Sequence, residues 1–310
     1  IDFKPTILVT GATGFLGKEL LNTLVEKGFC VRIICRKSSN ITSLPNRNID
    51  IHYVDIRDID KSDDIFNNIE VVIHCASALK GNWNDHYETS VLGTQKLLEQ
   101  CIKHNIKKIV HISSMGILDY SNIKQGQIIN ENSPVEKYPD KRGFYTKAKL
   151  LQEEIVKKYI EKTNLDITII RPGIIVDPNN YSMMTDIGFR FKSIIMHIGF
   201  RNRVLRIVSL DNLIKSILLS FKLEVTKGKI YNVLDPEIKT INYIKTNIGY
   251  NGILIRFPII IFVVFFAIAD FLLSKLPGQN KRYLVYKLIG MTKSFDYDIS
   301  LAEQDFKNDV

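Results

Sequence analysis

Apolar and polar positions alternate along the first half of the chain in two patterns, one typical of strands and one typical of helices. Short, continuously apolar runs rich in β-branched residues predict buried parallel strands. Between them, apolar residues recur every three or four positions, which predicts helices. The predicted strands are 6–9, 30–35, 50–54, 71–76, 108–113 and 167–171, and the later long helices are 85–104 and 144–162. This alternation predicts an α/β fold with a doubly wound parallel sheet.

After residues 177–180 the regular alternation ends, which predicts a smaller lobe over the carboxyl ends of the strands. We therefore expect a main domain at 1–180 and a C-terminal lobe at 181–310. Segments near 208–235 are expected to return to the main domain. Ligands of such folds lie in the crevice at the carboxyl ends of the strands, so the lobe is the predicted substrate-binding part.

A glycine-rich turn, Thr-Gly-Ala-Thr-Gly-Phe-Leu-Gly at residues 10–17, joins the first predicted strand to a helix that stops at Gly28. Gly11 permits a tight turn, and Gly14 lets backbone N–H groups approach a pyrophosphate closely. Gly17 lets the helix pack against the strand, while the helix dipole favours the anion. Strand, turn and helix in this order predict a dinucleotide-binding domain.

A second constellation lies at the start of the helix predicted over 144–162. Tyr145 and Lys149 are four residues apart and therefore share one face of that helix. A phenol with a pKa of about 10 is a poor acid or base at neutral pH, and a nearby ammonium group lowers that pKa. Ser113 and Ser114 end the preceding strand, where a hydroxyl can bind a substrate oxygen. These residues predict an acid–base site.

Together these motifs resemble the short-chain dehydrogenase/reductase superfamily, in its extended branch of nucleotide-sugar epimerases, dehydratases and ketoreductases. The resemblance implies a Rossmann-type fold and extends to about residue 235. The matching segments are 10–17, 54–58, 74–77, 113–114, 145–149, 171–173, 208–212 and 231–233.

By this resemblance, Ser114 polarises a carbonyl or hydroxyl, Tyr145 donates or accepts the proton, and Lys149 lowers the pKa of Tyr145 and binds the nicotinamide ribose. The residues that it assigns to cofactor binding are Gly11, Thr13, Gly14, Phe15, Leu16, Gly17, Arg36, Asp55, Ile56, Ala76, Ser77, Tyr145, Lys149 and Pro172. The implied activity is NAD(P)-dependent hydride transfer at a ketone or secondary alcohol.

The chain departs from the resembled pattern at three places. Ser90 stands where many relatives carry Asn, and Met115 with Gly116 replaces the acidic pair that resembles a 4,6-dehydratase, which disfavours dehydration. The second strand ends in Arg36 rather than an acidic residue. Arg36 suits a ribose 2′-phosphate, which favours NADP over NAD. Stacking of Arg36 on the adenine is the alternative, and it would accept either cofactor.

The substrate has two interpretations. One is a nucleotide-activated sugar, the substrate of a 4-ketoreductase or an epimerase. It is supported by a group of basic residues that could clamp the diphosphate of such a substrate; the alternative is that these residues form a solvated basic face. Those residues are Arg190, Lys192, Arg201, Arg203 and Arg206. An apolar ketone or aldehyde, as in dihydroflavonol reductases and 3β-hydroxysteroid dehydrogenases, is the alternative. A non-catalytic dinucleotide-sensing module is a hypothesis of another class. Relatives often pair through the two long helices, so a homodimer is an expectation from resemblance.

Composition and charge limit the kinds of partner and cellular compartment that we expect for this protein. The 310 residues are 45% hydrophobic and 24% charged, with a net charge of +9, and no nucleic-acid motif accompanies the basic residues. The positive net charge then has three remaining explanations: an anionic small-molecule ligand, contact with a membrane surface, or solvated surface charge. Cys30, Cys35, Cys75 and Cys101 lack paired spacing, which indicates buried residues of a reducing, cytoplasmic protein. The histidines lack metal-ligand spacing, and His74 and His111 are expected to be satisfied core residues, so no metal is predicted.

One segment, 257–269, is apolar on all sides but shorter than the roughly 20 residues of a spanning helix. One interpretation is a buried helix that begins at Pro258. The other is a patch resting on a membrane through residues 257–276, with Arg256, Lys275, Lys281 and Arg282 nearby.

Overall fold

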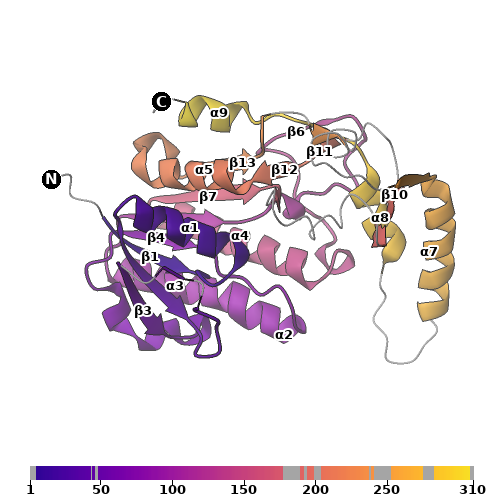
Figure 1. Ribbon diagram of the computed structural model, residues 1–310. Coiled ribbons are helices and arrows are strands. Elements are labelled where there is room, and N and C mark those ends of the chain that lie inside the picture. The colour runs from indigo at the N-terminus through magenta and orange to yellow at the C-terminus, as the bar shows by residue number, and fades with distance from the viewer. Residues whose placement is uncertain are drawn as a thin grey trace.

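Seven parallel strands form the central sheet of the protein (Figure 1). The computed structural model describes residues 5–42, 44–45, 48–176, 189–191, 194–198, 204–236, 239–240, 253–274 and 283–307. The strands are β1 (Thr6–Thr10), β2 (Cys30–Cys35), β3 (Ile49–Tyr53), β4 (Val71–His74), β5 (Lys108–Ile112), β7 (Ile167–Pro172) and β13 (Ile230–Val233). Their order in the sheet is β13-β7-β5-β4-β1-β2-β3. The predicted α/β fold with a Rossmann-type sheet is confirmed.

Helices cover both faces of this sheet, which explains why its strands are continuously apolar. Ile7 and Val9 of β1 face one side, in a cluster with α1 (Phe15–Glu26) and α5 (Leu210–Lys222). Leu8 faces the other side, in a cluster with α3 (Gly93–Lys103) and α4 (Phe144–Lys162). The helix predicted over 85–104 consists of three segments: α2 (Trp83–His86), a π-helical stretch (Tyr87–Leu92) and α3.

The strand order reverses direction at β1, which pairs with β2 on one side and β4 on the other. The chain builds β2 and β3 outward from β1 in one direction and β4, β5 and β7 in the other. The turns that leave β1 and β4 therefore diverge to opposite faces, and the carboxyl ends of these two strands form the topological switch point of the sheet, where ligands of such folds bind. This is the place where the glycine-rich turn lies.

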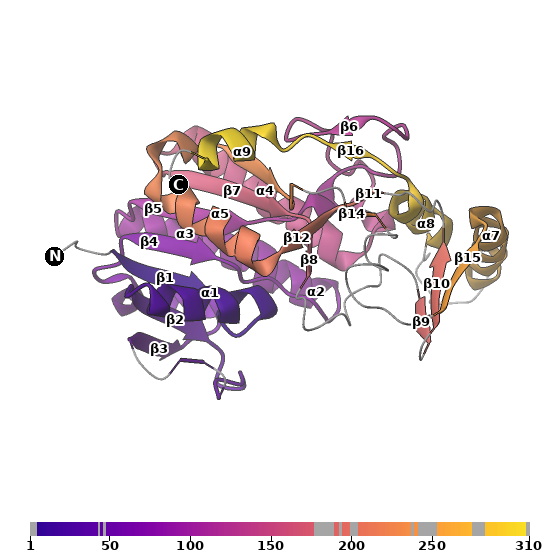
Figure 2. The same ribbon diagram turned by 45° about the horizontal axis from the view of Figure 1, so that its top comes forward.

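Short sheets and helices gather beyond the carboxyl ends of the main strands (Figure 2). The strands there are β6 (Ile128–Ile129), β8 (Ile174–Val176), β9 (Phe189–Phe191), β10 (Ile194–Ile198), β11 (Val204–Leu205), β12 (Ile207–Ser209), β14 (Lys239–Thr240), β15 (Ile253–Phe257) and β16 (Asp296–Tyr297). The helices are α7 (Ile259–Ser274) and α8 (Leu284–Thr292). Short 3-10 turns lie at Ile56–Lys61, Asp63–Phe66, Met115–Ile117, Pro139–Lys141 and Glu224–Thr226.

The end of the chain returns to the main sheet through α9 (Ser300–Phe306). The Asp305 carboxylate accepts hydrogen bonds from the Tyr231 hydroxyl of β13 and the Lys229 ammonium group, both at 2.7 Å. The rings of Tyr231 and Phe306 lie 4.7 Å apart. Together with α5 and β13, this helix ties the later half of the chain to the edge of the sheet.

Two sequence expectations need correction. Cys30 is exposed at the start of β2, because a residue at a strand end lies outside the helix-covered part of the sheet, whereas Cys35 and Cys101 are buried as expected. The apolar segment from Pro258 onward is helical but largely exposed, so its interpretation as a buried helix is wrong.

Several basic residues of the predicted clamp and membrane patch fall outside the described part of the chain. These are Lys192, Arg201, Arg203, Lys275, Lys281 and Arg282. For Arg190 and Arg256 the structure describes the backbone, in β9 and β15.

Candidate active site

The glycine-rich turn is packed so tightly that side chains are excluded from it. Gly11 has φ +73°, and a Cβ there would lie 2.7 Å from Ala76 N, in the loop after β4. A Cβ on Gly17 would overlap the carbonyl oxygen of Gly11, and one on Gly14 would lie 3.2 Å from that same oxygen. Gly11 and Gly17 therefore leave no room for a side chain, and the backbone of the turn packs directly against the loop after β4.

The first turn of α1 follows directly and offers unpaired amide groups. Gly14 is the N-cap, no side chain caps the helix, and no acidic residue lies in its first turn. The N–H groups of Phe15, Leu16 and Gly17 have no carbonyl four residues back inside the helix. These donors and the helix dipole form a cradle whose chemistry fits a dinucleotide pyrophosphate. Beside it, the predicted ligand Thr13 is half-buried.

The loop after β4 is held against this turn by hydrogen bonds. The Thr10 hydroxyl accepts from Ala76 N at 3.3 Å and lies 2.7 Å from His74 Nδ1. Ser90, which replaces Asn of the resembled pattern, accepts from Ala78 N at 2.9 Å and lies 3.0 Å from the Ser77 hydroxyl. Ser90 thus fixes the loop that carries two of the predicted cofactor residues.

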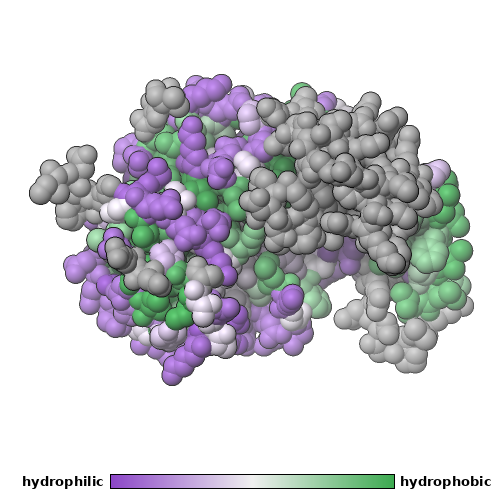
Figure 3. Space-filling view, in the orientation of Figure 1, coloured by the Kyte–Doolittle hydropathy of each residue, from purple (hydrophilic) through white to green (hydrophobic). Residues whose placement is uncertain are grey.

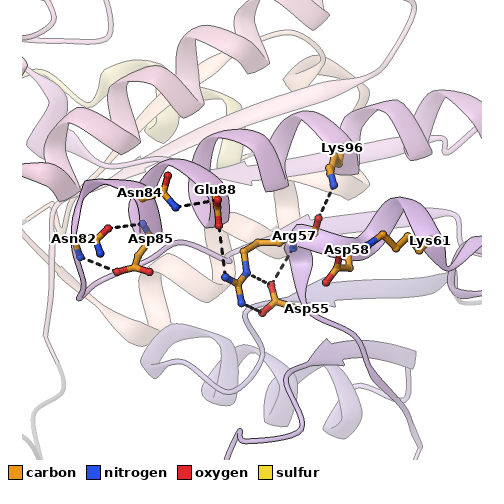
Figure 4. A network of polar contacts seen from close by, with 9 residues as sticks. All are labelled: Asp55, Arg57, Asp58, Lys61, Asn82, Asn84, Asp85, Glu88 and Lys96. Carbon is orange, nitrogen blue, oxygen red and sulfur yellow. Dashed lines mark hydrogen bonds and ion pairs between the residues drawn. The ribbon is translucent and has the colours of Figure 1, made fainter.

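A polar network occupies the carboxyl end of β3 (Figure 4). Arg57 donates to both oxygens of Asp55, at 3.0 and 2.8 Å, and its guanidinium lies 3.7 Å from Glu88. The Arg57 hydrogen bond is the main cause that lowers the pKa of Asp55, and the charge of Arg36 contributes. Arg36 is exposed directly after β2. Ile56, between Asp55 and Arg57, is buried.

Ser114 and Tyr145 meet above the end of β5. Ser114 begins a 3-10 turn, where its hydroxyl accepts from Gly116 N at 3.0 Å. Tyr145 is half-buried in the first turn of α4. Loss of hydration raises the pKa of Tyr145, and the interaction with the Ser114 hydroxyl only partly offsets this effect. The expected lowering of this pKa by Lys149 is not found, because the ammonium group is held elsewhere.

Lys149 lies one turn further along α4, with 3% of the residue exposed. Its ammonium group donates to the carbonyl oxygen of Ile112, the last residue of β5, at 2.7 Å. Burial lowers the pKa of Lys149 to about 8. A lysine in this state exchanges its proton near neutral pH, which suits a proton-transfer site. Pro172, also a predicted cofactor residue, is buried at the end of β7.

A buried ionic cluster beneath these residues escaped the sequence analysis. Glu153 accepts from Arg171 Nη2 at 2.6 Å, from Arg171 Nε at 2.9 Å and from the Ser113 hydroxyl at 2.6 Å. Lys157 lies 2.8 Å from the same carboxylate. The signal available in the sequence was the position of Glu153, one turn after Lys149 on the same helix. The cluster ties α4 to the ends of β5 and β7, where the candidate catalytic residues stand.

A second missed group is centred on Gln152. Its side-chain amide donates to the Thr94 hydroxyl at 2.7 Å and to Ala76 O at 3.2 Å, and Thr94 lies 2.8 Å from His74 Nε2. His74 is thus a satisfied core residue, as expected. His111 is buried beside it, with ring centroids 5.3 Å apart, but neither of its nitrogens has a hydrogen-bond partner among the described residues, so its expected satisfaction is wrong.

Three curated relatives illustrate what the chain resembles. Sterol demethylase protein B of Methylococcus capsulatus is 27% identical over 56% of this chain and 52% of its own length. A putative UDP-glucose 4-epimerase of Methanocaldococcus jannaschii is 31% identical over 53% and 54%. The chain spans about half the length of these two. N-acetyl-alpha-D-glucosaminyl-diphospho-ditrans,octacis-undecaprenol 4-epimerase of Escherichia coli O157:H7 is 25% identical over 74% and 67%.

Solved structures agree on the fold. The terminal R domain of the myxalamid PKS-NRPS pathway has a TM-score of 0.75 at 17% identity and covers 100% of this chain and 86% of its own. UDP-glucose 4-epimerase of Thermotoga maritima, solved with UDP-glucose, has a TM-score of 0.66 at 23% identity, with coverages of 82% and 85%. The family model described as "NAD dependent epimerase/dehydratase family" matches residues 7–192, more than half of the chain. The protein belongs to the NAD dependent epimerase/dehydratase family.

Proposed function

We propose that this protein is an NAD(P)-dependent oxidoreductase or epimerase that transfers hydride at a ketone or secondary alcohol. The observation that carries the proposal is that three side chains gather at the carboxyl end of β5: Ser114 follows that strand, Tyr145 begins α4 beside it, and Lys149, one helical turn further, donates to Ile112 O. This group stands at the carboxyl ends of the strands, on the same edge as the bare glycine-rich turn. A dinucleotide laid across the switch point would bring its nicotinamide toward these side chains.

Each side chain has a role that its surroundings support. The hydroxyl of Ser114 would orient a substrate oxygen, and Tyr145 would give that oxygen a proton or take one from it. Lys149, with its lowered pKa, would hold a ribose hydroxyl and replace the proton lost by Tyr145. When bound, the nicotinamide supplies or accepts the hydride. The first amides of α1 would bind the pyrophosphate.

A nucleotide-activated sugar is the substrate class that we favour. Arg142 stands three residues before Tyr145. Its pKa is lowered mainly by burial and secondly by the charge of Arg206, which lies close to it. The Arg206 guanidinium lies 4.3 Å from the centre of the Tyr120 ring. Two neighbouring arginines, one of them 3.7 Å from the Glu136 carboxylate, would suit a diphosphate. The relatives from M. jannaschii and E. coli are named for 4-epimerases of diphosphate-linked sugars.

An apolar ketone or aldehyde is the second candidate. One observation favours it: the C-terminal lobe carries α7, whose large apolar side chains are exposed. The M. capsulatus relative is named for sterol demethylation, and a further relative, from Arabidopsis thaliana, is a dihydroflavonol 4-reductase at 28% identity over 57% of this chain and 51% of its own length. We also propose NADP as the preferred cofactor and residues 181–310, without the 208–235 segments, as the substrate lobe. A homodimer through the helical segments at 85–104 and 144–162 is a further part of the proposal.

The Tyr145→Phe variant tests the proposed activity. It removes the acidic hydroxyl but keeps the ring, so turnover should fall by about a hundredfold or more, while cofactor binding is retained. Tyr53→Phe, an exposed tyrosine on β3, is the matched control and should leave turnover unchanged. Unchanged turnover in Tyr145→Phe would exclude the assigned role. Failure of the wild type to bind either dinucleotide would exclude the enzyme altogether.

Titration with NADPH and NADH, followed by competition with UDP or dTDP, separates the two substrate classes. Protection of the NADPH-bound protein by a nucleoside diphosphate supports the sugar-nucleotide substrate. Binding of NADPH without any nucleotide effect supports an apolar carbonyl compound.

A further inference from the structure

Helix α7 presents a continuous apolar face to the exterior. Seven of its large apolar side chains are each more than half exposed, and they recur at helical spacing along one side. They are Ile260, Ile261, Val264, Phe265, Ile268, Phe271 and Leu272. Figure 3 shows this helix as a hydrophobic band at the edge of the molecule, away from the sheet domain. Exposed apolar patches of this extent mark interaction surfaces.

The other side of α7 is anchored to the lobe. Asp270, its one acidic residue, accepts a hydrogen bond from Val285 N of α8 at 3.2 Å, so its carboxylate is directed inward. Helix α8 is fixed in turn: the Tyr286 hydroxyl donates to Glu136 at 2.6 Å, and the ammonium group of Lys293 donates to Ser121 O at 2.7 Å. The outward band therefore rests on a firm support rather than on a free segment.

The positive charge of the sequence is concentrated in two segments, one of which contains this helix. Segments 187–210 and 238–295 together hold thirteen of the 42 Lys and Arg residues but one of the 33 Asp and Glu residues. The rest of the chain carries 29 basic and 32 acidic residues, so these two segments account for the whole positive net charge. The first includes β9 and β10, and the second includes β15, which pairs with β10, followed by α7 and α8.

The combination fits a lipid surface better than a protein partner. Protein interfaces are enriched in Tyr, Trp, Phe and Arg and carry hydrogen bonds, whereas the exposed band contains only Ile, Val, Phe and Leu and no polar side chain. A bilayer needs no matching polar groups on the band, and anionic headgroups neutralise flanking basic residues. With 16 residues, α7 is about 24 Å long. Among the described residues no helix meets the length and hydropathy needed to cross a membrane.

We propose that α7 is a docking surface for anionic lipid bilayers, lying in the plane of the headgroup region with its apolar band inserted, and that the basic composition of the segments around it in the sequence favours anionic headgroups. The inference is independent of the proposed catalytic activity. Binding through α7 would also fix the orientation of the proposed substrate lobe relative to the membrane. The reason is that α8 connects the band to Glu136 and Arg142, near the candidate base.

Vesicle flotation tests the proposal with the full chain. The protein should float with phosphatidylcholine vesicles that contain phosphatidylglycerol, and bind vesicles of phosphatidylcholine alone much more weakly. The Ile261→Asp/Phe265→Asp variant should lose at least about tenfold in partitioning, because charged groups would enter the acyl boundary. Val225→Asp is the matched control. Val225 is an exposed apolar residue of the 3-10 turn Glu224–Thr226, outside the band, and this variant should float like the wild type.

Three outcomes would overturn the proposal. They are wild-type protein that does not float, equal flotation with neutral vesicles, and flotation that the double variant does not reduce. Light scattering that finds a dimer in the wild type and a monomer in the Ile261→Asp/Phe265→Asp variant would assign the band to a second copy instead. Unchanged thermal unfolding of each variant ensures that the comparison concerns folded protein.

Discussion

Glu153 of α4 and Arg171 of β7 form a two-pronged ion pair in the interior, and 1% of each side chain is exposed. The pair joins α4, the helix that carries Tyr145 and Lys149, to β7. Strand β7 lies beside β5, the strand after which Ser114 stands. A buried pair of this kind costs desolvation free energy on both charges, and good geometry is needed to offset it. The Ser113 hydroxyl and Lys157 complete the hydrogen bonding of the carboxylate.

Removal of one partner should be strongly destabilising. Arg171→Met leaves the Glu153 carboxylate buried without its guanidinium and should lower the free energy of unfolding by about 3–5 kcal/mol. Urea denaturation measures the change. The double variant Glu153→Gln/Arg171→Met should recover part of the loss, because no uncompensated charge remains. Lys307→Met breaks a solvent-exposed pair with Glu303 and should cost less than about 1 kcal/mol. Equal losses at the two sites would contradict this account.

Lys149 should make stability depend on pH in a defined window. Its pKa is about 8 in the folded protein and 10.5 ordinarily, so the unfolded chain binds more protons between these values. The free energy of unfolding should therefore rise with pH through this window, by at most about 3 kcal/mol from this group. The measurement is the difference between wild type and Lys149→Met in urea, which cancels the contributions of tyrosines common to both. A difference that stays constant with pH would refute the lowered pKa.

The packing of Gly17 against Gly11 should tolerate no side chain. Gly17→Ala forces a methyl group against a backbone carbonyl and should cost about 1–3 kcal/mol of stability or shift α1 away from the turn. Dinucleotide binding, followed by fluorescence titration, should weaken with it. Gly126→Ala is the comparison, since a methyl group there would meet no atom within 4 Å, although its φ of +81° adds backbone strain. Full binding by Gly17→Ala would argue against the cradle.

Arg36 should decide between the two dinucleotides. If it pairs with a ribose 2′-phosphate, Arg36→Ser should weaken NADPH binding by about ten- to a hundredfold and leave NADH binding nearly unchanged. Isothermal titration with both cofactors measures this. Lys61→Ser, an exposed basic residue on the turn after β3, should affect neither. Parallel losses for NADPH and NADH would indicate adenine stacking instead of phosphate recognition.

Local patterns in the sequence were enough to predict most elements of the main sheet and its helices. Strands such as 30–35 and helix 144–162 follow from patterns in neighbouring residues, because burial on both faces demands continuous apolar runs and burial on one face demands helical spacing. The glycine-rich turn was readable for the same reason, since glycine at fixed spacing answers a local steric requirement. The π-helical stretch at Tyr87–Leu92 was not readable, because it changes the hydrogen bonding of the backbone and leaves the helical pattern nearly intact.

Properties that depend on partners distant in sequence could not be predicted in this way, because they follow from how the elements pack together. The segment around α7 is apolar on all sides, so its sequence does not indicate which side of the helix is buried. Its exposure follows from what the rest of the lobe leaves uncovered. The pairing of Glu153 with Arg171 and the hold of Ile112 on Lys149 arise from how α4 lies across the sheet. The pKa of Lys149 and the exposure of Cys30 have the same origin. Local patterns set which elements form, whereas burial and charge environment are set by the contacts between them.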